Sequence, residues 1–214
     1  MSMGDRNAEM RSAIVMDWTD SHYYRNAEGW LDTFWAPRSP FLPLFRQLDL
    51  TRVIELACGH GRHAAQILDQ AGEITLIDFE PRNIAACRER FAGRDKLRFI
   101  VNAGHDLPGC EDGGTSALFS YDAMVHFELL DVIAYIREAH RVLRPGGRAL
   151  LHVSNNRQNP GGFYHQNTHW RNFGSLDVFL HVADRIGFER LDSRTLDWSG
   201  AKELDGLMLL ERRA

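Results

Sequence analysis

A segment of fifteen residues, 51–65, constrains the fold more than any other part of the chain. Residues 53–57 form an apolar run of the length of a buried strand, interrupted by one carboxylate, Glu55. Gly59 and Gly61 follow, and residues that favour helix continue over about 62–70. The pattern predicts a β-strand, a tight glycine turn and an α-helix, in that order.

A turn of this kind is typical of a cofactor-binding loop. Glycine adopts backbone conformations denied to other residues, and its missing Cβ lets a ligand lie against the main chain. The helix that follows directs its first N–H groups and the positive end of its dipole at the same point. Gly59, Gly61 and Ala64 also have the G-x-G-x-x-A spacing of dinucleotide-binding proteins, so the glycines alone do not identify the cofactor.

Two carboxylates narrow the choice of cofactor. Glu55 stands near the end of a strand that we expect to be buried, where its charge needs a partner. An ammonium group on the cofactor supplies that partner, and a pyrophosphate does not. Residues 73–78 read as a second strand ending in Asp78, about 17 residues after Gly61, in position to accept hydrogen bonds from ribose hydroxyls.

The remainder of the chain alternates strand and helix patterns, which favours a mostly parallel sheet. We expect helices over about 81–91, 129–143 and 175–186, and strands over 96–101, 115–121, 148–154, 188–198 and 204–211. The last two strands are expected to form a hairpin. A long polar loop with interleaved aromatic residues, 155–174, joins the expected strand 148–154 to the expected helix 175–186. Loops of this length are usually functional or disordered.

Four segments together resemble class I S-adenosylmethionine-dependent methyltransferases. Glu-Leu-Ala-Cys-Gly-His-Gly over 55–61, with Asp78 after the next strand, is similar to the first two motifs of that family. Ser-Tyr-Asp-Ala-Met-Val-His-Phe-Glu over 120–128 and Arg-Val-Leu-Arg-Pro-Gly-Gly over 141–147 are similar to its fourth-strand and pre-fifth-strand segments. The resemblance covers about residue 51 to the C-terminus. It implies a Rossmann-like α/β fold, in which a seven-stranded, mostly parallel sheet carries helices on both faces and an antiparallel C-terminal strand.

The resemblance implies S-adenosyl-L-methionine as the cofactor and also which residues bind it. Asp78 would hold the ribose, with Phe79 packed on the adenine. This chain has Ala103 where the family commonly has an acid that binds the adenine amino group, so Gly104 or His105 is expected to replace it. The methionine portion would contact residues of the first and fourth strand ends: Glu55, Ala57, Gly59, Gly61 and Ser120.

Methyl transfer from a sulfonium requires mainly that the acceptor be held in line and lose a proton where it is a hydroxyl or ammonium. His126 is the first candidate base, because it follows the fourth strand and the unperturbed histidine pKa, near 6.5, suits the task. A structural or substrate hydrogen bond is the alternative for His126, and a buried, satisfied role is expected for His152. The candidate acceptor-binding residues come from the aromatic N-terminal segment and the long loop: Tyr24, Trp30, Tyr164, His169 and Arg171.

We expect two units, a helical N-terminal segment 1–50 packed on the core and a cofactor-binding domain 51–214. The N-terminal segment either packs on the sheet edge or closes over the cofactor as a lid, which would exclude water from the transfer site. Cys58 in the glycine turn is either a small turn residue or, as the less favoured alternative, a nucleophile. The histidines match no compact ligand spacing, so no metal is expected.

Composition and charge limit the classes of partner that we expect this chain to bind. A net charge of −4 gives no reason to expect nucleic acid, and no apolar run has the length of a membrane span. Three cysteines without a Cys-x-x-Cys pair, and no basic-then-apolar N-terminal signal, favour a reducing cytoplasmic setting. A small-molecule methyl acceptor is therefore the expected partner, and the oligomeric state stays open.

Three rival functions remain at this point. A nicotinamide-dependent oxidoreductase would use the same glycine turn. A non-catalytic S-adenosylmethionine-binding protein would have the same scaffold, because fold does not fix function. A nucleic-acid or protein methyltransferase would need a basic or extended groove beside the cofactor.

Overall fold

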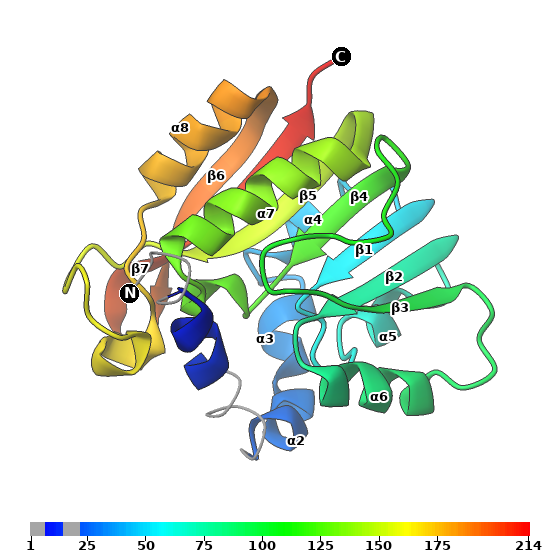
Figure 1. Cartoon of the computed structure of the whole chain (residues 1–214), viewed down its shortest axis with the longest axis horizontal. Coiled ribbons are helices and arrows are strands. Elements are labelled where there is room, and N and C mark those ends of the chain that lie inside the picture. Colours follow the sequence, from blue (N-terminus) through cyan, green and yellow to red (C-terminus); the bar gives the residue numbers. More distant parts are fainter. Residues whose placement is uncertain (1–6, 15–21) are drawn as a thin grey trace.

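The computed structural model describes residues 7–14 and 22–214 of the chain. Its centre is a seven-stranded sheet of order β3-β2-β1-β4-β5-β7-β6 (Figure 1). The strands are β1 (Arg52–Leu56), β2 (Glu73–Asp78), β3 (Leu97–Val101), β4 (Thr115–Ser120), β5 (Leu143–Ser154), β6 (Phe188–Trp198) and β7 (Ala201–Arg212). The first five run parallel, and β7 pairs antiparallel with both β5 and β6. This is the Rossmann-like sheet with an antiparallel C-terminal strand that the sequence predicts.

Helices cover both faces of the sheet. On one face lie α7 (Leu129–Val142) and α8 (Leu176–Ile186), which are in front of the sheet in Figure 1. The other face carries α4 (Leu42–Phe45), α5 (Ala64–Ile67) and α6 (Pro81–Arg90). Residues 7–14, α2 (Tyr23–Ala27), η1 (Glu28–Trp30) and α3 (Leu31–Trp35) form the described part of the N-terminal segment.

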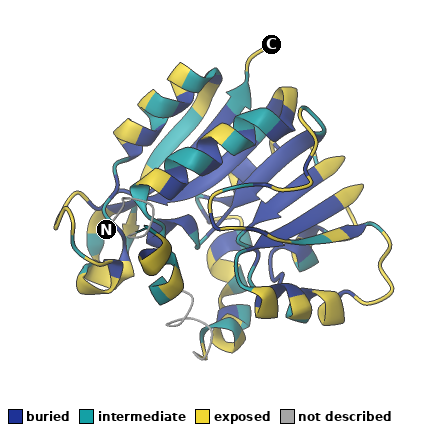
Figure 2. Ribbon diagram, in the orientation of Figure 1, coloured by how far each residue is buried: buried dark blue, intermediate teal, exposed yellow. Residues whose placement is uncertain are grey.

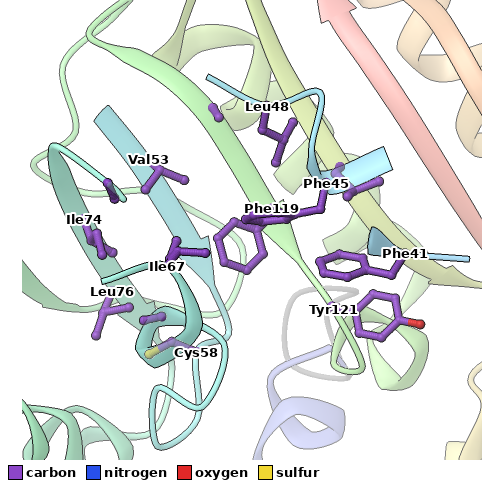
Figure 3. Packing of buried hydrophobic residues seen from close by; sticks show 14 of the residues in the cluster. Phe41, Phe45, Leu48, Val53, Cys58, Ile67, Ile74, Leu76, Phe119 and Tyr121 are labelled. Atoms are coloured by element: carbon purple, nitrogen blue, oxygen red, sulfur yellow. The ribbon is translucent and has the colours of Figure 1, made fainter. Parts of the chain in front are cut away.

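The core follows the alternation of side chains along the strands. Val53 and Phe119 point to one face, where they pack with Phe41, Phe45 and Ile67 (Figure 3). Ile54, Leu56 and Leu118 point to the other face, against α7 and α8. The central strands β1, β2 and β4 are accordingly buried along nearly their whole length, as expected for parallel strands covered on both faces (Figure 2).

Two predicted boundaries differ from the structure. The helix expected over 62–70 is regular only over Ala64–Ile67, because hydrogen bonds at its ends mix spacings of three and four residues, as in Gln66 N–H to His63 and Ala65 N–H to Gly61. The fifth strand begins at Leu143 rather than at residue 148. Leu143 already pairs with Thr115, and the register then shifts across the Pro-Gly-Gly segment.

The described helices include none that is both long and apolar enough to cross a membrane.

Candidate cofactor and acceptor site

A cavity of about 140 Å³ lies at the carboxyl ends of β1, β2, β3 and β4. The strand order reverses between β1 and β4, and ligands of open α/β sheets bind at such a reversal. The lining combines the glycine turn, the residues that follow β2, β3 and β4, the first half of α7, and the N-terminal segment. Segments far apart in sequence therefore meet around one space.

The glycine turn offers its main chain to this cavity. Ala57 and Gly59 line it, with φ values of 56° and 53° in the left-handed region. A Cβ built on Gly59 would lie 2.8 Å from the Tyr24 ring, which stacks on His60 with ring centroids 4.2 Å apart. Only glycine at position 59 therefore permits both this backbone conformation and the close approach of Tyr24.

Asp78 fixes the turn from the end of β2. Its Oδ2 accepts the Gly59 N–H at 2.8 Å, and its Oδ1 accepts the Glu80 N–H and the Asn83 amide at 2.9 and 3.0 Å. Burial raises the pKa of Asp78, and these three hydrogen bonds oppose the shift. A carboxylate has about four acceptor positions, so Oδ2 retains one for a ligand hydroxyl.

Asn102 follows β3 and lines the cavity. Its amide group donates to the Asp106 carbonyl at 2.7 Å and to the Tyr135 hydroxyl at 2.8 Å. Its Oδ1 is buried and has no hydrogen-bond partner among the described residues. An unsatisfied buried carbonyl oxygen costs about 1–3 kcal/mol, which a donor on a ligand would recover.

Glu55 lies behind the glycine turn rather than on the cavity surface. The side chain shares a sheet face with Val53 and accepts a hydrogen bond from the Ala64 N–H. Burial raises its pKa to about 8, and Oε2 has no partner among the residues described. The Ser120 hydroxyl, also outside the lining, is likewise buried with no described partner.

A buried ion pair joins three segments where β4 ends. Asp122 Oδ2 accepts from the Arg62 guanidinium at 2.8 Å and from the Tyr23 hydroxyl at 2.6 Å. Arg62 comes from the glycine turn and Tyr23 from α2, so the pair ties both to the end of β4. Burial would raise the pKa of Asp122, but the Arg62 charge and the Tyr23 hydrogen bond outweigh it and hold the pKa below its ordinary value.

His126 lines the same cavity from the turn after β4. Its Nδ1 lies 2.6 Å from the Trp170 carbonyl oxygen, an acceptor, so Nδ1 carries the proton and the lone pair of the neutral ring is on Nε2. Burial, together with the charge of Arg171, lowers the His126 pKa to about 4. The ring is therefore neutral at pH 7.

A second buried network supports the loop 155–174 behind this site. Arg171 donates to both oxygens of Asp205, at 2.8 and 2.7 Å, and both side chains are almost fully buried. His152 donates from Nε2 to Asp205, and its Nδ1 accepts the Asp122 N–H. His152 is thus a buried, satisfied histidine, as its strand position indicates.

The structure brings together about half of the predicted site residues. Those that line the cavity are Ala57, Gly59, Asp78, Phe79, Gly104, His126 and Tyr24. Those that lie outside its lining are Glu55, Gly61, His105, Ser120, Trp30, Tyr164, His169 and Arg171. Gly61 has an internal role, because a Cβ there would lie 2.6 Å from the Phe91 ring. Trp30 is half exposed, and Tyr164 is buried within the loop.

Arg62 and Asn102 are among the lining residues that sequence reasoning missed. Arg62 directly follows Gly61 in the glycine turn, and a charged side chain next to a segment that packs on the sheet is a signal for a buried partner. Asn102 is the first residue after the third strand, one position before Ala103, where the resembled family commonly has an acid. Across residues 7–14 and 22–214, no three His, Cys, Asp or Glu side chains are grouped so as to hold a metal ion.

The sheet order, the glycine turn and the carboxylate that ends β2 define the class of protein as a Rossmann-like methyltransferase fold. The family model described as a methyltransferase domain matches residues 53–147. Residues 53–147, somewhat under half of the chain, therefore match the methyltransferase domain family, and the cofactor of class I S-adenosylmethionine-dependent methyltransferases is S-adenosyl-L-methionine.

Curated and solved relatives agree with this assignment. The demethylmenaquinone methyltransferase of Clavibacter sepedonicus is 31% identical over 47% of this chain and 40% of its own length. The ubiquinone biosynthesis O-methyltransferase of Xanthomonas oryzae is 29% identical over 51% of this chain and 46% of its own. The chain thus spans less than half the length of these two relatives. The geranyl diphosphate C-methyltransferase of Streptomyces coelicolor has the same fold, with a TM-score of 0.63, 15% identity and coverage of 79% of this chain and 76% of that one.

Proposed function

We propose that this chain transfers a methyl group from S-adenosyl-L-methionine to a small-molecule acceptor. The observation that carries the proposal is the cavity at the strand reversal, where the open main chain of Ala57 and Gly59 faces the carboxylate of Asp78. The names of the two curated relatives refer to demethylmenaquinone and to ubiquinone biosynthesis, which concern small molecules, and they support this acceptor class.

The residues present fit the cofactor. Asp78 Oδ2 has a remaining acceptor position for a ribose hydroxyl, and the unsatisfied Asn102 Oδ1 suits the adenine amino group. Asn102 thereby takes the role that the family gives to an acid, which revises the expectation for Gly104 and His105. Phe79 supplies an apolar surface for the adenine. The bound cofactor would supply an activated methyl group, and residues of this chain would hold the acceptor and remove its proton.

His126 remains the proposed base. The Trp170 carbonyl fixes its tautomer, so Nε2 is the nitrogen with the lone pair, and its lowered pKa keeps it unprotonated at pH 7. A ring with a pKa of about 4 is a weak base, which suits an acceptor that becomes strongly acidic only as the methyl group is transferred. The described N-terminal residues cover the cavity, and we propose that this segment acts as a lid.

Incubation with methyl-labelled S-adenosylmethionine and fractionated metabolite extracts tests the proposal. Label should move into a low-molecular-mass product with wild-type protein, and His126→Gln should lower its rate with little change in S-adenosylhomocysteine affinity. Tight S-adenosylhomocysteine binding without label transfer to any fraction would instead favour a non-catalytic binding protein.

A further inference from the structure

The cavity contains three buried carboxylates, and one of them differs from the others. Both oxygens of Asp78 accept hydrogen bonds from protein donors. Both oxygens of Asp131 accept hydrogen bonds from the Arg11 guanidinium at 2.9 Å. Asp122 accepts both of its side-chain hydrogen bonds on Oδ2. Its Oδ1 receives no hydrogen bond from any residue that the structure describes, although Asp122 lines the cavity.

The backbone of Asp122 is also held in an unusual conformation. Its φ is 58°, a left-handed value that costs a non-glycine residue about 1–3 kcal/mol. The Asp122 N–H donates to His152 Nδ1 at 3.1 Å, and His152 is fixed in turn by Asp205. The buried network therefore maintains a strained conformation that presents this carboxylate to the cavity.

Anionic ligands are disfavoured at this end of the cavity. The two lining arginines, Arg11 and Arg62, each already bind a carboxylate, and no lysine belongs to the lining within the part of the chain that the structure describes. A carboxylate or phosphate near Asp122 would face a like charge in a site of low dielectric, where the neighbouring cation, Arg62, is already paired with Asp122 itself. A donor group would instead find an acceptor already in place.

We propose that Asp122 is the acceptor-recognition residue, whose Oδ1 binds an N–H or O–H group and thereby selects neutral or cationic amines and alcohols over carboxylates and phosphates. The inference rests on the proposed function, since it concerns the acceptor end of the same cavity. Arg62 and Tyr23 hold Oδ2, and so they position the carboxylate without occupying the oxygen that meets the acceptor.

Three small ligands that share a phenyl ring and differ in the polar group test whether the cavity prefers donors to anions: benzylamine, benzyl alcohol and benzoate. Each is titrated by ligand-observed NMR into protein saturated with S-adenosylhomocysteine. The amine and the alcohol should bind wild type at least about tenfold more tightly than benzoate. In Asp122→Asn, the amide oxygen can still accept from Arg62 and Tyr23, which turns the amide N–H group toward the cavity. The preference should therefore disappear or reverse.

Asp177→Asn is the control, because it makes the same carboxylate-to-amide change at another arginine-paired aspartate, one that lies outside the cavity lining. It should retain the wild-type preference. Thermal unfolding and S-adenosylhomocysteine affinity of each variant establish that it is folded and loads normally. Equal binding of benzoate and benzylamine to wild type, no binding of any probe, or an unchanged preference in Asp122→Asn would overturn the inference. Failure of S-adenosylhomocysteine itself to bind would instead overturn the proposed function.

Discussion

Glu55 is a single residue that makes the free energy of unfolding depend on pH. Its pKa is about 8 in the folded chain against an ordinary value of 4.5. Between these values the folded state retains a proton that the unfolded state has lost. The free energy of unfolding therefore falls as pH rises from about 4.5 towards about 8, and the contribution is fully present only below the lower value.

Glu55→Gln should remove this pH dependence. Glutamine is neutral at every pH and can still accept the Ala64 N–H, so the variant should lose less stability than wild type between pH 5 and pH 8. Urea unfolding at a series of pH values measures the slope. Glu73→Gln, at an exposed position, is the control and should retain the wild-type slope. The same slope in Glu55→Gln would show that Glu55 does not carry the effect.

Gly59 tests whether the close approach of Tyr24 matters in addition to backbone conformation. Gly59→Ala adds a methyl group 2.8 Å from the Tyr24 ring, whereas Gly93→Ala, also at positive φ, meets nothing within 4 Å. Both should lose about 1–2 kcal/mol from the left-handed conformation. Only Gly59→Ala should also lose S-adenosylhomocysteine affinity by calorimetry. Equal affinities in the two variants would contradict a binding role for this turn.

At the scale of elements, the loop 155–174 depends on one buried ion pair. Arg171→Met leaves Asp205 buried without its guanidinium, which should cost about 3–5 kcal/mol in urea unfolding. Adding Asp205→Asn should recover part of the loss, because the uncompensated charge is then gone. Arg157→Met is the control in the same loop, since its pair with Asp177 is exposed and worth little. A double variant as unstable as Arg171→Met would argue against charge burial as the cause.

The N-terminal segment makes a second prediction at this scale. Tyr23 bonds to Asp122, and Tyr24 covers Gly59, so the segment contacts both ends of the cavity. S-adenosylhomocysteine should slow amide hydrogen exchange over residues 22–35, with α8 unchanged as the internal reference. Identical exchange with and without the ligand would mean that the segment is a fixed part of the core and not a lid.

Over the whole molecule, the fold was predictable from the sequence and the site only in part. Strand identity follows from local apolar runs such as 53–57, and the ends of parallel strands converge by topology, which correctly gathers Gly59, Asp78 and His126. Side-chain direction does not follow so simply. Glu55 alternates with Leu56 and so faces α5, while Arg171 pairs with Asp205, which lies 34 positions later in the sequence. Only three-dimensional packing decides such partners.

Calorimetric titration with S-adenosylhomocysteine, run beside NAD and NADP, tests the cofactor assignment on which every proposal above depends. We predict binding of S-adenosylhomocysteine alone, and weaker binding in Asp78→Asn, which loses the charge of the carboxylate between the glycine turn and the ribose. Binding of a nicotinamide cofactor, with no heat from S-adenosylhomocysteine, would contradict the assignment.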